Sequence, residues 1–178
     1  MKAFYRRISV WDRLVVRRWQ RVSLSMSIDR LLKLCMRVGD GWGWVAIASV
    51  LYLAQPWPFF RILIGQALLA VAISLPVYWA LKLGFRRVRP FAVRGTQPRV
   101  PPLDKFSFPS GHTMNNLAVA MTLALHIPLL WPLAVIPVAL GLLRVLYGVH
   151  FVSDIAAGAV LGAFSSLGAH WLFQRLIS

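Results

Sequence analysis

The sequence has very few acidic residues. Its 178 residues include no glutamate and five aspartates against 20 lysines and arginines, so the formal net charge is +15. Charged residues of both signs make up 14% of the chain, compared with about 25% in soluble domains. With 58% hydrophobic residues, a water-soluble fold would expose large adhesive patches and is excluded. The five aspartates are Asp12, Asp29, Asp40, Asp104 and Asp154.

Cysteine is also nearly absent. The single Cys35 excludes an internal disulfide framework and a cysteine-based zinc site. Intrinsic disorder is excluded because the chain has ample apolar surface to bury. A pI near 11.7 is typical of nucleic-acid-binding proteins, but the mean hydropathy of +0.65 favours membrane lipids as partners and no nucleic acid. We therefore expect an integral membrane protein.

Uncharged stretches mark where the chain crosses the membrane. Four of them, with His126 taken as neutral, span residues 41–60, 62–81, 106–143 and 155–174. Roughly 20 helical residues cross a hydrocarbon core of about 30 Å, and prolines 128 and 132 divide the longest stretch. We predict an all-α, polytopic membrane helix bundle with five transmembrane helices, near residues 41–55, 61–81, 110–128, 132–150 and 154–174.

Residues 1–39 differ in kind from the rest. Ten basic residues alternate there with hydrophobic ones, and no uninterrupted apolar stretch of a secretory signal is present. This pattern predicts one or two amphipathic helices on an anionic bilayer surface, although an organelle transit peptide has a similar composition. We divide the chain into a basic amphipathic interfacial segment, 1–39, and a transmembrane domain, 40–178.

A second basic cluster precedes the third expected helix. Its seven cations, between residues 82 and 105, would on their own indicate a solvated, membrane-anchoring face. The loop ends, however, in Pro109-Ser110-Gly111-His112. Ser110 is a good helix N-cap and Gly111 permits close backbone approach, so the free amides of this helix end form a potential anion site. An ordinary N-cap would not explain the adjacent histidine.

The end of the fourth expected helix carries a further polar group. Arg144 lies within an otherwise apolar stretch, where a buried cation needs a partner or a polar cavity. His150 and Asp154 have the i, i+4 spacing of one helical face, unless Ser153 restarts the helix. A carboxylate on one imidazole nitrogen leaves the other free as a nucleophile or base, although such a pair taken alone is more often structural.

Alternating helices bring these polar residues to one face of the membrane. Cations, helix-end amides, two histidines and a carboxylate suit a phosphoryl group whose charge the cations neutralise. His126 and His170 fall toward the opposite face and are expected to be interfacial or structural. The converging residues are Lys82, Arg89, Ser110, His112, Arg144, His150 and Asp154.

Three motifs in this order carry a family resemblance. They are Lys82-x6-Arg89-Pro90, Pro109-Ser110-Gly111-His112 and Arg144-x5-His150-x3-Asp154. The set resembles the three-part motif of the type 2 phosphatidic acid phosphatase family, whose superfamily includes vanadium haloperoxidases and acid phosphatases. That family's third motif commonly begins Ser-Arg. Leu143 stands at the serine position here, so one phosphate contact or supporting hydrogen bond is expected to be missing.

The resemblance implies a catalytic role for each motif residue. His150 would attack phosphorus and form a phosphohistidine while Asp154 holds its ring, and His112 would protonate the leaving oxygen and later activate water. No metal or other cofactor is implied, and a chain without glutamate suits a two-metal carboxylate site poorly. The residues implied in phosphate binding are Lys82, Arg89, Ser110, Gly111 and Arg144. Two roles stay open for the other arginines of the loop: they attract an anionic lipid head group, or they merely coat the loop. These residues are Arg86, Arg87, Arg94 and Arg99.

The expected function is hydrolysis of a membrane lipid phosphate or diphosphate. Undecaprenyl diphosphate is favoured because small family members resemble bacterial polyprenyl diphosphate phosphatases. Phosphatidylglycerophosphate, phosphatidic acid and lipid A phosphate are alternatives, as is a lipid phosphotransferase. A non-enzymatic anion transporter would not need a His–Asp pair and a second histidine, and a scaffold with a vestigial site is favoured only by Leu143.

The charge distribution predicts an orientation in the bacterial inner membrane. Seventeen basic residues lie on the motif face and two, Arg61 and Arg175, on the other, so the positive-inside rule places the site in the cytoplasm. Two points oppose this: several loop cations serve phosphate, and many family members act on the periplasmic face behind a sixth helix. Here residues 8–39 would have to provide that helix, at roughly 2.5–3.5 kcal/mol per basic residue near the centre.

Overall fold

The computed structural model describes residues 2–94 and 98–177, and every regular element among them is helical. The all-α prediction is therefore confirmed. A π-helical turn, η1 (Val38–Trp42), and a 3-10 segment, η2 (Pro128–Ala134), adjoin the α-helices. The α-helices are α1 (Lys2–Trp19), α2 (Met26–Arg37), α3 (Gly43–Ala54), α4 (Trp57–Phe85), α5 (Pro90–Val93), α6 (Gly111–His126), α7 (Val135–Leu146) and α8 (Val152–Ile177).

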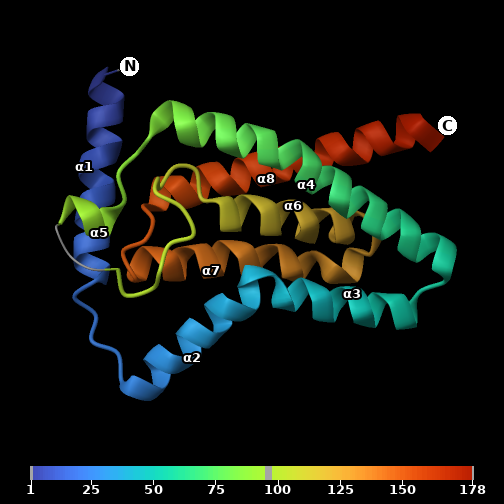
Figure 1. Cartoon of the computed structure of the whole chain (residues 1–178), viewed down its shortest axis with the longest axis horizontal. Coiled ribbons are helices and arrows are strands. Elements are labelled where there is room, and N and C mark those ends of the chain that lie inside the picture. Colours follow the sequence, from blue (N-terminus) through green and yellow to red (C-terminus); the bar gives the residue numbers. More distant parts are fainter. Residues whose placement is uncertain (1, 95–97, 178) are drawn as a thin grey trace.

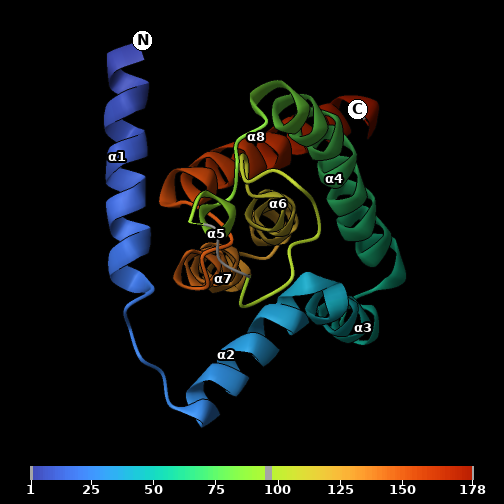
Figure 2. The same cartoon turned by 60° about the vertical axis from the view of Figure 1, so that its left-hand side comes forward.

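Helix α6 forms the centre of the bundle, surrounded by α4, α7 and α8 (Figure 2). Two glycines of α8 let it approach α6 closely. A Cβ atom at Gly158 would lie 2.6 Å from the carbonyl oxygen of Ser110, and one at Gly162 would collide with the backbone of Met114. Because any side chain there would push the helices apart, this packing fixes the start of α8 beside the start of α6.

The helices that run along the bundle correspond to the predicted spans. These are α3, α4, α6, η2 with α7, and α8 (Figure 1). Among the described residues, three segments are long and apolar enough to cross a membrane: Trp57–Val93, Pro128–Leu146 and Val152–Leu176. The other two helices are shorter, because α3 has 12 residues before the Gln55-Pro56 break and α6 has 16 between its Ser110 cap and Ile127.

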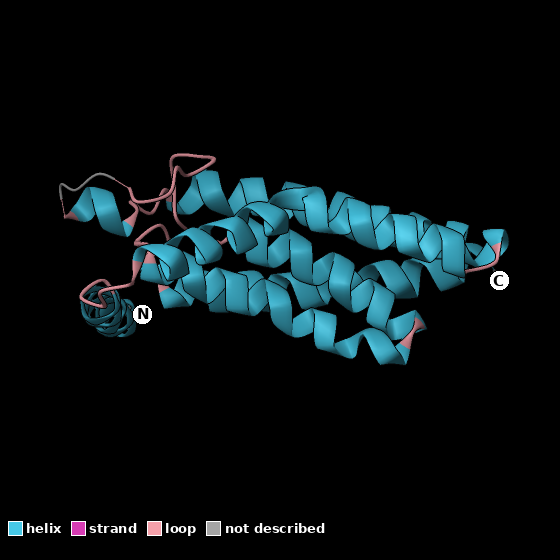
Figure 3. Cartoon of the chain, turned by 90° about the horizontal axis from the view of Figure 1, so that it is seen from below, coloured by secondary structure: helices cyan, strands magenta, loops and turns pink. Residues whose placement is uncertain are grey.

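The N-terminal segment is helical, as predicted, and lies at one end of the bundle. Figure 3 shows α1 almost end-on while the bundle helices run across the view, so α1 lies crosswise to them. Its Val16 is 2% exposed and packs against Val145, Phe151 and Ile155. Helix α2, capped by Ser25, leads through η1 into α3. The assignment of residues 1–39 to a bilayer surface stays a prediction.

Candidate active site

The motif residues meet at the end of the bundle where α4 and α7 end and α6 and α8 begin (Figure 1). Most of them are buried, although several are charged. Removing charges from water is costly unless partners compensate, so the partners define what the site can bind. The most deeply buried predicted site residues are Lys82, Arg89, Ser110, Arg144, His150 and Asp154, each at most 4% exposed.

His150 lies in the turn between α7 and α8. Helix α7 ends at Leu146, four residues earlier than the predicted span, so the His150–Asp154 pair forms across a turn instead of along a continuous helix. Nδ1 of His150 lies 3.5 Å from Oδ2 of Asp154, and Nε2 lies 3.3 Å from Nη1 of Arg89. Burial lowers the pKa of His150 to about 4, which favours the neutral ring near pH 7. A neutral imidazole is the form that can act as a nucleophile.

Asp154 is held from two sides. Its Oδ2 accepts a hydrogen bond from the backbone N–H of Phe151 at 2.8 Å, and its Oδ1 accepts one from Nη1 of Arg87 at 2.7 Å. Nη2 of Arg87 donates to Oδ2 of Asp12 at 2.7 Å, and Asp12 also accepts from the backbone N–H of Ser153 at 3.1 Å. Fully buried Asp12 therefore links α1 to the carboxylate beside His150.

Lys82 and Arg89 both contact Asp104. Nζ of Lys82 lies 2.7 Å from Oδ2 of Asp104, and Nη2 of Arg89 lies 2.8 Å from Oδ1. The hydroxyl of Tyr78 donates to the same carboxylate at 2.6 Å. Burial alone would raise the pKa of Asp104, but the hydrogen bonds from Lys82 and Tyr78 lower it to about 2. Two buried cations that share an ionised carboxylate have the charge and the donors to bind a phosphate oxygen.

His112 and Arg144 share a second carboxylate, that of Asp40. Nε2 of His112 lies 2.8 Å from Oδ1 of Asp40, and Arg144 forms an ion pair with the same oxygen. Burial raises the pKa of Asp40, but its contacts with His112 and Arg144 lower it overall. Asp40 lies in η1, which is tied to α6 because Asn116 donates to the carbonyl of Gly39 at 2.9 Å. The turn between α2 and α3 therefore faces the N-terminal end of α6, where His112 lies.

Ser110 caps α6, as predicted. Its hydroxyl accepts a long hydrogen bond, 3.5 Å, from the N–H of Thr113, and its own N–H donates to the carbonyl of Asp154 at 3.0 Å. The ring of Tyr78 lies against Gly111, where an added Cβ would be 2.6 Å from a ring carbon. Only glycine fits here, so the first-turn amides of α6 lie within the polar end of the bundle.

Residues 63–178 match the family model described as the PAP2 superfamily. This chain belongs to the PAP2 superfamily. The match confirms the resemblance that the three motifs indicate, and it covers all of them.

Individual relatives extend the match. A decaprenylphosphoryl-5-phosphoribose phosphatase of Mycobacterium tuberculosis is 33% identical over 68% of this chain and 66% of its own length. A protein named bacitracin transport permease protein BcrC, of Bacillus licheniformis, is 38% identical over 39% of this chain and 35% of its own. Each match therefore spans less than two thirds of the relative.

A solved structure has the same fold. It is the crystal structure of a transmembrane PAP2-type phosphatidylglycerolphosphate phosphatase of Bacillus subtilis, which aligns with a TM-score of 0.71. The two chains are 23% identical, and the alignment covers 94% of this chain and 87% of that one.

Several groups at this PAP2 site were not anticipated from the motifs. Asp12, Asp40, Asp104 and Tyr78 all contact motif residues or Arg87. The scarcity of acidic residues could have indicated the role of the aspartates, because each of five carboxylates among 20 cations will find a basic partner. Nothing in their spacing, however, says which basic residue that partner is. Of the arginines left open, Arg87 is now placed, while Arg86 and Arg94 donate to Leu83 and Gln20.

The two remaining histidines lie away from this site. His126 and His170 both contact Oε1 of Gln66, at 2.6 and 3.4 Å, and their rings lie 5.5 Å apart. This agrees with their predicted separation from the motif residues.

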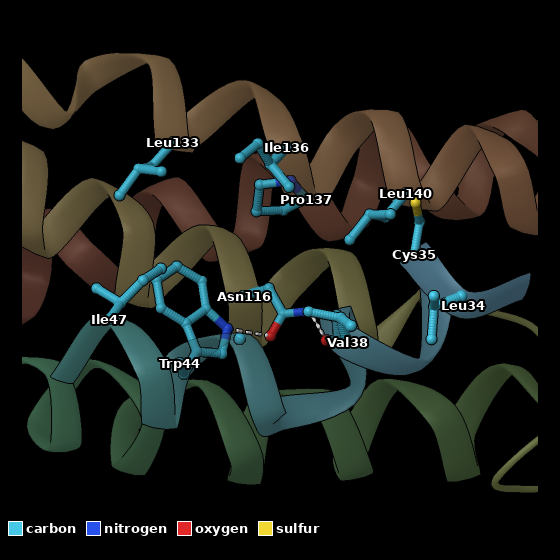
Figure 4. Close-up of a pocket in the computed structure, with 12 residues that line it drawn as sticks. Leu34, Cys35, Val38, Trp44, Ile47, Asn116, Leu133, Ile136, Pro137 and Leu140 are labelled. Carbon is cyan, nitrogen blue, oxygen red and sulfur yellow. Dashed lines mark hydrogen bonds between the residues drawn. The ribbon is translucent and has the colours of Figure 1, made fainter. Parts of the chain in front are cut away.

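An apolar groove of about 450 Å³ runs beside the polar site, between α2 and α3 on one side and α6 and α7 on the other. Figure 4 shows Leu34, Trp44 and Leu140 around it, with Asn116 hydrogen-bonded to Trp44 at 2.7 Å. Asn116 lies one helical turn beyond His112 on α6. The groove therefore begins one helical turn from His112.

Proposed function

We propose that this PAP2 protein is a membrane lipid phosphatase whose substrate is a phosphate monoester or diphosphate, with a polyprenyl diphosphate, namely undecaprenyl diphosphate, favoured. The observation that carries the proposal is the buried His150, with one ring nitrogen toward Asp154 and the other toward Arg89. An imidazole that lies between a carboxylate and a cation is placed to attack an anionic phosphoryl group.

The mechanism proceeds in two steps. Nε2 of His150 attacks phosphorus, the bond from phosphorus to the leaving oxygen breaks, and His112 gives that oxygen a proton. Water then attacks the phosphohistidine as His112 takes up its proton, and the phosphorus–nitrogen bond breaks to release phosphate. Lys82, Arg89 and Arg144 neutralise charge on the phosphoryl oxygens, assisted by Ser110 and the Gly111 amide. No step uses a metal ion.

The phosphoryl group has to replace two carboxylates of the protein. Asp104 occupies Lys82 and Arg89, and Asp40 occupies Arg144 and His112. Because phosphate carries more charge and more acceptor oxygens than a carboxylate, it competes for these donors on favourable terms. The exchange keeps the cations paired in both states, which limits the cost of burying them.

The apolar groove accounts for the lipid part of the substrate. We assign its occupant as the first isoprenoid units of the substrate chain, since the groove begins one turn from His112 and is almost wholly apolar. That a relative is named for a decaprenyl-linked substrate supports this choice of chain.

The site is proposed to face the cytoplasm of a bacterial inner membrane. Helices α1 and α2 lie at the site end of the bundle (Figure 1). Residues 1–39, which include both helices, and residues 82–105 together hold seventeen basic residues. The positive-inside rule then places the C-terminus outside. Alkaline phosphatase fused after Ser178 should be active. Fluorescence of a cytoplasm-dependent reporter at that position would reverse the orientation.

The activity is tested with purified, detergent-solubilised protein on a panel of lipid phosphates. Phosphate release is expected to be fastest with undecaprenyl diphosphate, to survive EDTA and to be inhibited by orthovanadate, which mimics five-coordinate phosphorus. Transfer of the phosphoryl group to a second lipid in place of water would instead identify a phosphotransferase. Loss of turnover in EDTA with recovery in magnesium would overturn the metal-free mechanism.

A further inference from the structure

A basic vestibule of about 420 Å³ lies next to the proposed active site. We define it by its four cations: Arg30, Lys33 and Arg37 of α2, and Arg99 of the loop after α5. Asp40 also lines it. Because Asp40 contacts His112 at 2.8 Å, the vestibule adjoins the residue assigned to protonate the leaving group.

The charge of the vestibule is not fully used within the chain. Lys33 forms an ion pair with Asp29 at 2.8 Å, and Arg30 donates to the sulfur of Met26. Within the described part of the chain, neither Arg37 nor Arg99 forms an ion pair with a carboxylate. The lining holds four cations and one carboxylate, a net charge of +3, and that carboxylate is already paired with Arg144. The cavity is therefore suited to an anion.

The vestibule also borders the apolar groove, because Leu34 of α2 lines both cavities. Figure 4 shows Leu34 at the groove. Helix α2 leads directly into η1, which carries Asp40. Three environments therefore lie next to the turn between α2 and α3: Arg144 and His112, which contact Asp40, the basic vestibule, and the groove. A lipid diphosphate has three parts that need the same environments, namely a terminal phosphoryl group, a second phosphate and an apolar chain.

We propose that the vestibule binds the second phosphate of a lipid diphosphate, which is the leaving group of the reaction. This rests on the proposed phosphatase function and specifies its substrate class. When His150 attacks the terminal phosphorus, the bond to the bridging oxygen breaks and the leaving group departs as a lipid monophosphate. The vestibule cations stabilise the negative charge that this phosphate gains as the bond breaks. Without them, only the proton from His112 would neutralise that charge. A monoester places no phosphate there.

The test compares two substrates that differ only in the second phosphate: farnesyl diphosphate and farnesyl monophosphate. In the Arg37→Gln/Arg99→Gln double variant, kcat/KM for the diphosphate should fall roughly tenfold or more, as expected for loss of charge-assisted contacts to phosphate. The monophosphate should change less than twofold. The charge-retaining Arg37→Lys/Arg99→Lys variant should keep most of the diphosphate activity, which separates charge from packing.

The matched control is Arg17→Gln/Arg18→Gln on α1, which removes the same charge from exposed positions outside the vestibule. It should leave the ratio of the two substrates unchanged. Equal losses on both substrates, or an equal change of ratio in the control, would show that the arginines act only through general membrane electrostatics and would overturn the proposal.

A binding measurement covers the case in which the monophosphate is a poor substrate. Methylenediphosphonate, a non-hydrolysable diphosphate, should inhibit the wild type more strongly than orthophosphate does. The Arg37→Gln/Arg99→Gln variant should lose about tenfold of that preference. If this variant kept the full preference for methylenediphosphonate over orthophosphate, the vestibule assignment would be refuted. Turnover by the wild type would still support the phosphatase function in that case. Absence of wild-type phosphate release from any lipid would instead refute the phosphatase function itself.

Discussion

The motif-bearing region and the N-terminal segment, taken here to include η1 and so to end at Trp42, supply the same site with different kinds of group. Between residues 82 and 154 the chain provides the histidines, the cations and the helix-end amides, each at a spacing set by a local structure such as a cap or a turn. The segment before residue 43 provides Asp12 and Asp40, which reach the site only through tertiary contacts. One comes from a crosswise helix and the other from a π-helical turn.

This difference between local and tertiary placement determines the role that each region can have. Groups that touch the reacting phosphorus must be placed within tenths of an ångström, and short-range structure does this best. Groups that neutralise or orient those residues act through ion pairs and hydrogen bonds, so they can come from distant parts of the chain. We therefore expect the N-terminal segment to act on positions and charges in the site, and the motif region to carry the chemistry of the proposed reaction.

The largest expected effect comes from the centre of the motif region. Replacing His150 with alanine should lower turnover by roughly 10⁴-fold or more, because no neighbouring group can take over covalent attack. Phosphate release and trapping of a phosphoenzyme measure it. His170→Ala, in a partly buried polar cluster with Gln66 and away from the motif residues, serves as the control and should retain activity. Turnover by a folded His150→Ala protein would rule out the phosphohistidine.

The next effect tests whether the N-terminal segment reaches the chemistry. Arg87→Leu leaves two buried carboxylates, Asp12 and Asp154, without their shared cation, and should lower kcat by roughly 10–100-fold with little change in KM. Asp12→Asn should show a smaller loss of the same kind. Arg86→Gln, at the exposed neighbouring position, is the control and should behave as wild type. A loss confined to thermal stability, with kcat intact, would limit Arg87 to a structural role.

The same two regions show what the sequence can and cannot reveal. Uncharged stretches of about 20 residues and the Ser110 cap predict the helices that build the bundle, because membrane thickness and backbone amides impose local rules. The motif residues were identified from their expected convergence at one end of the bundle and from the family resemblance. The partners of Asp12, Asp40 and Asp104 were not predicted, since no local pattern indicates where α1 crosses the bundle end or where η1 lies. Even within the motif region, one boundary was predicted wrongly: α7 ends at Leu146, whereas the predicted span extends to residue 150.

A moderate effect concerns pH and the motif region alone. Burial lowers the pKa of His150 to about 4, and His150 must be neutral to attack, so protonation should impair it only as pH falls through that value. Turnover limited by this group should therefore fall less than threefold between pH 7 and pH 5.5, instead of declining below the ordinary histidine pKa of about 6.5. The measurement is kcat against pH with one substrate throughout. An acid limb centred near 6.5 would show that the nucleophile is more accessible to water than the structure indicates.

The smallest expected effect lies where the two regions touch. Leu143, at the position where the family commonly has serine, packs in a cluster with Met36 of α2 and with Tyr147 and Val149 of the turn that carries His150. Its side chain thus serves packing between the N-terminal segment and the catalytic turn, in place of a phosphate contact. Leu143→Ser should lower stability by about 1–3 kcal/mol through lost apolar burial and change kcat/KM less than threefold. Thermal unfolding and phosphate release measure the two quantities, with Leu143→Met as a control that keeps the apolar volume. A large gain in activity in the Leu143→Ser variant would mean that the missing hydroxyl limits catalysis. The packing of Leu143 against Met36 would then matter less for activity than the phosphate contact that serine restores.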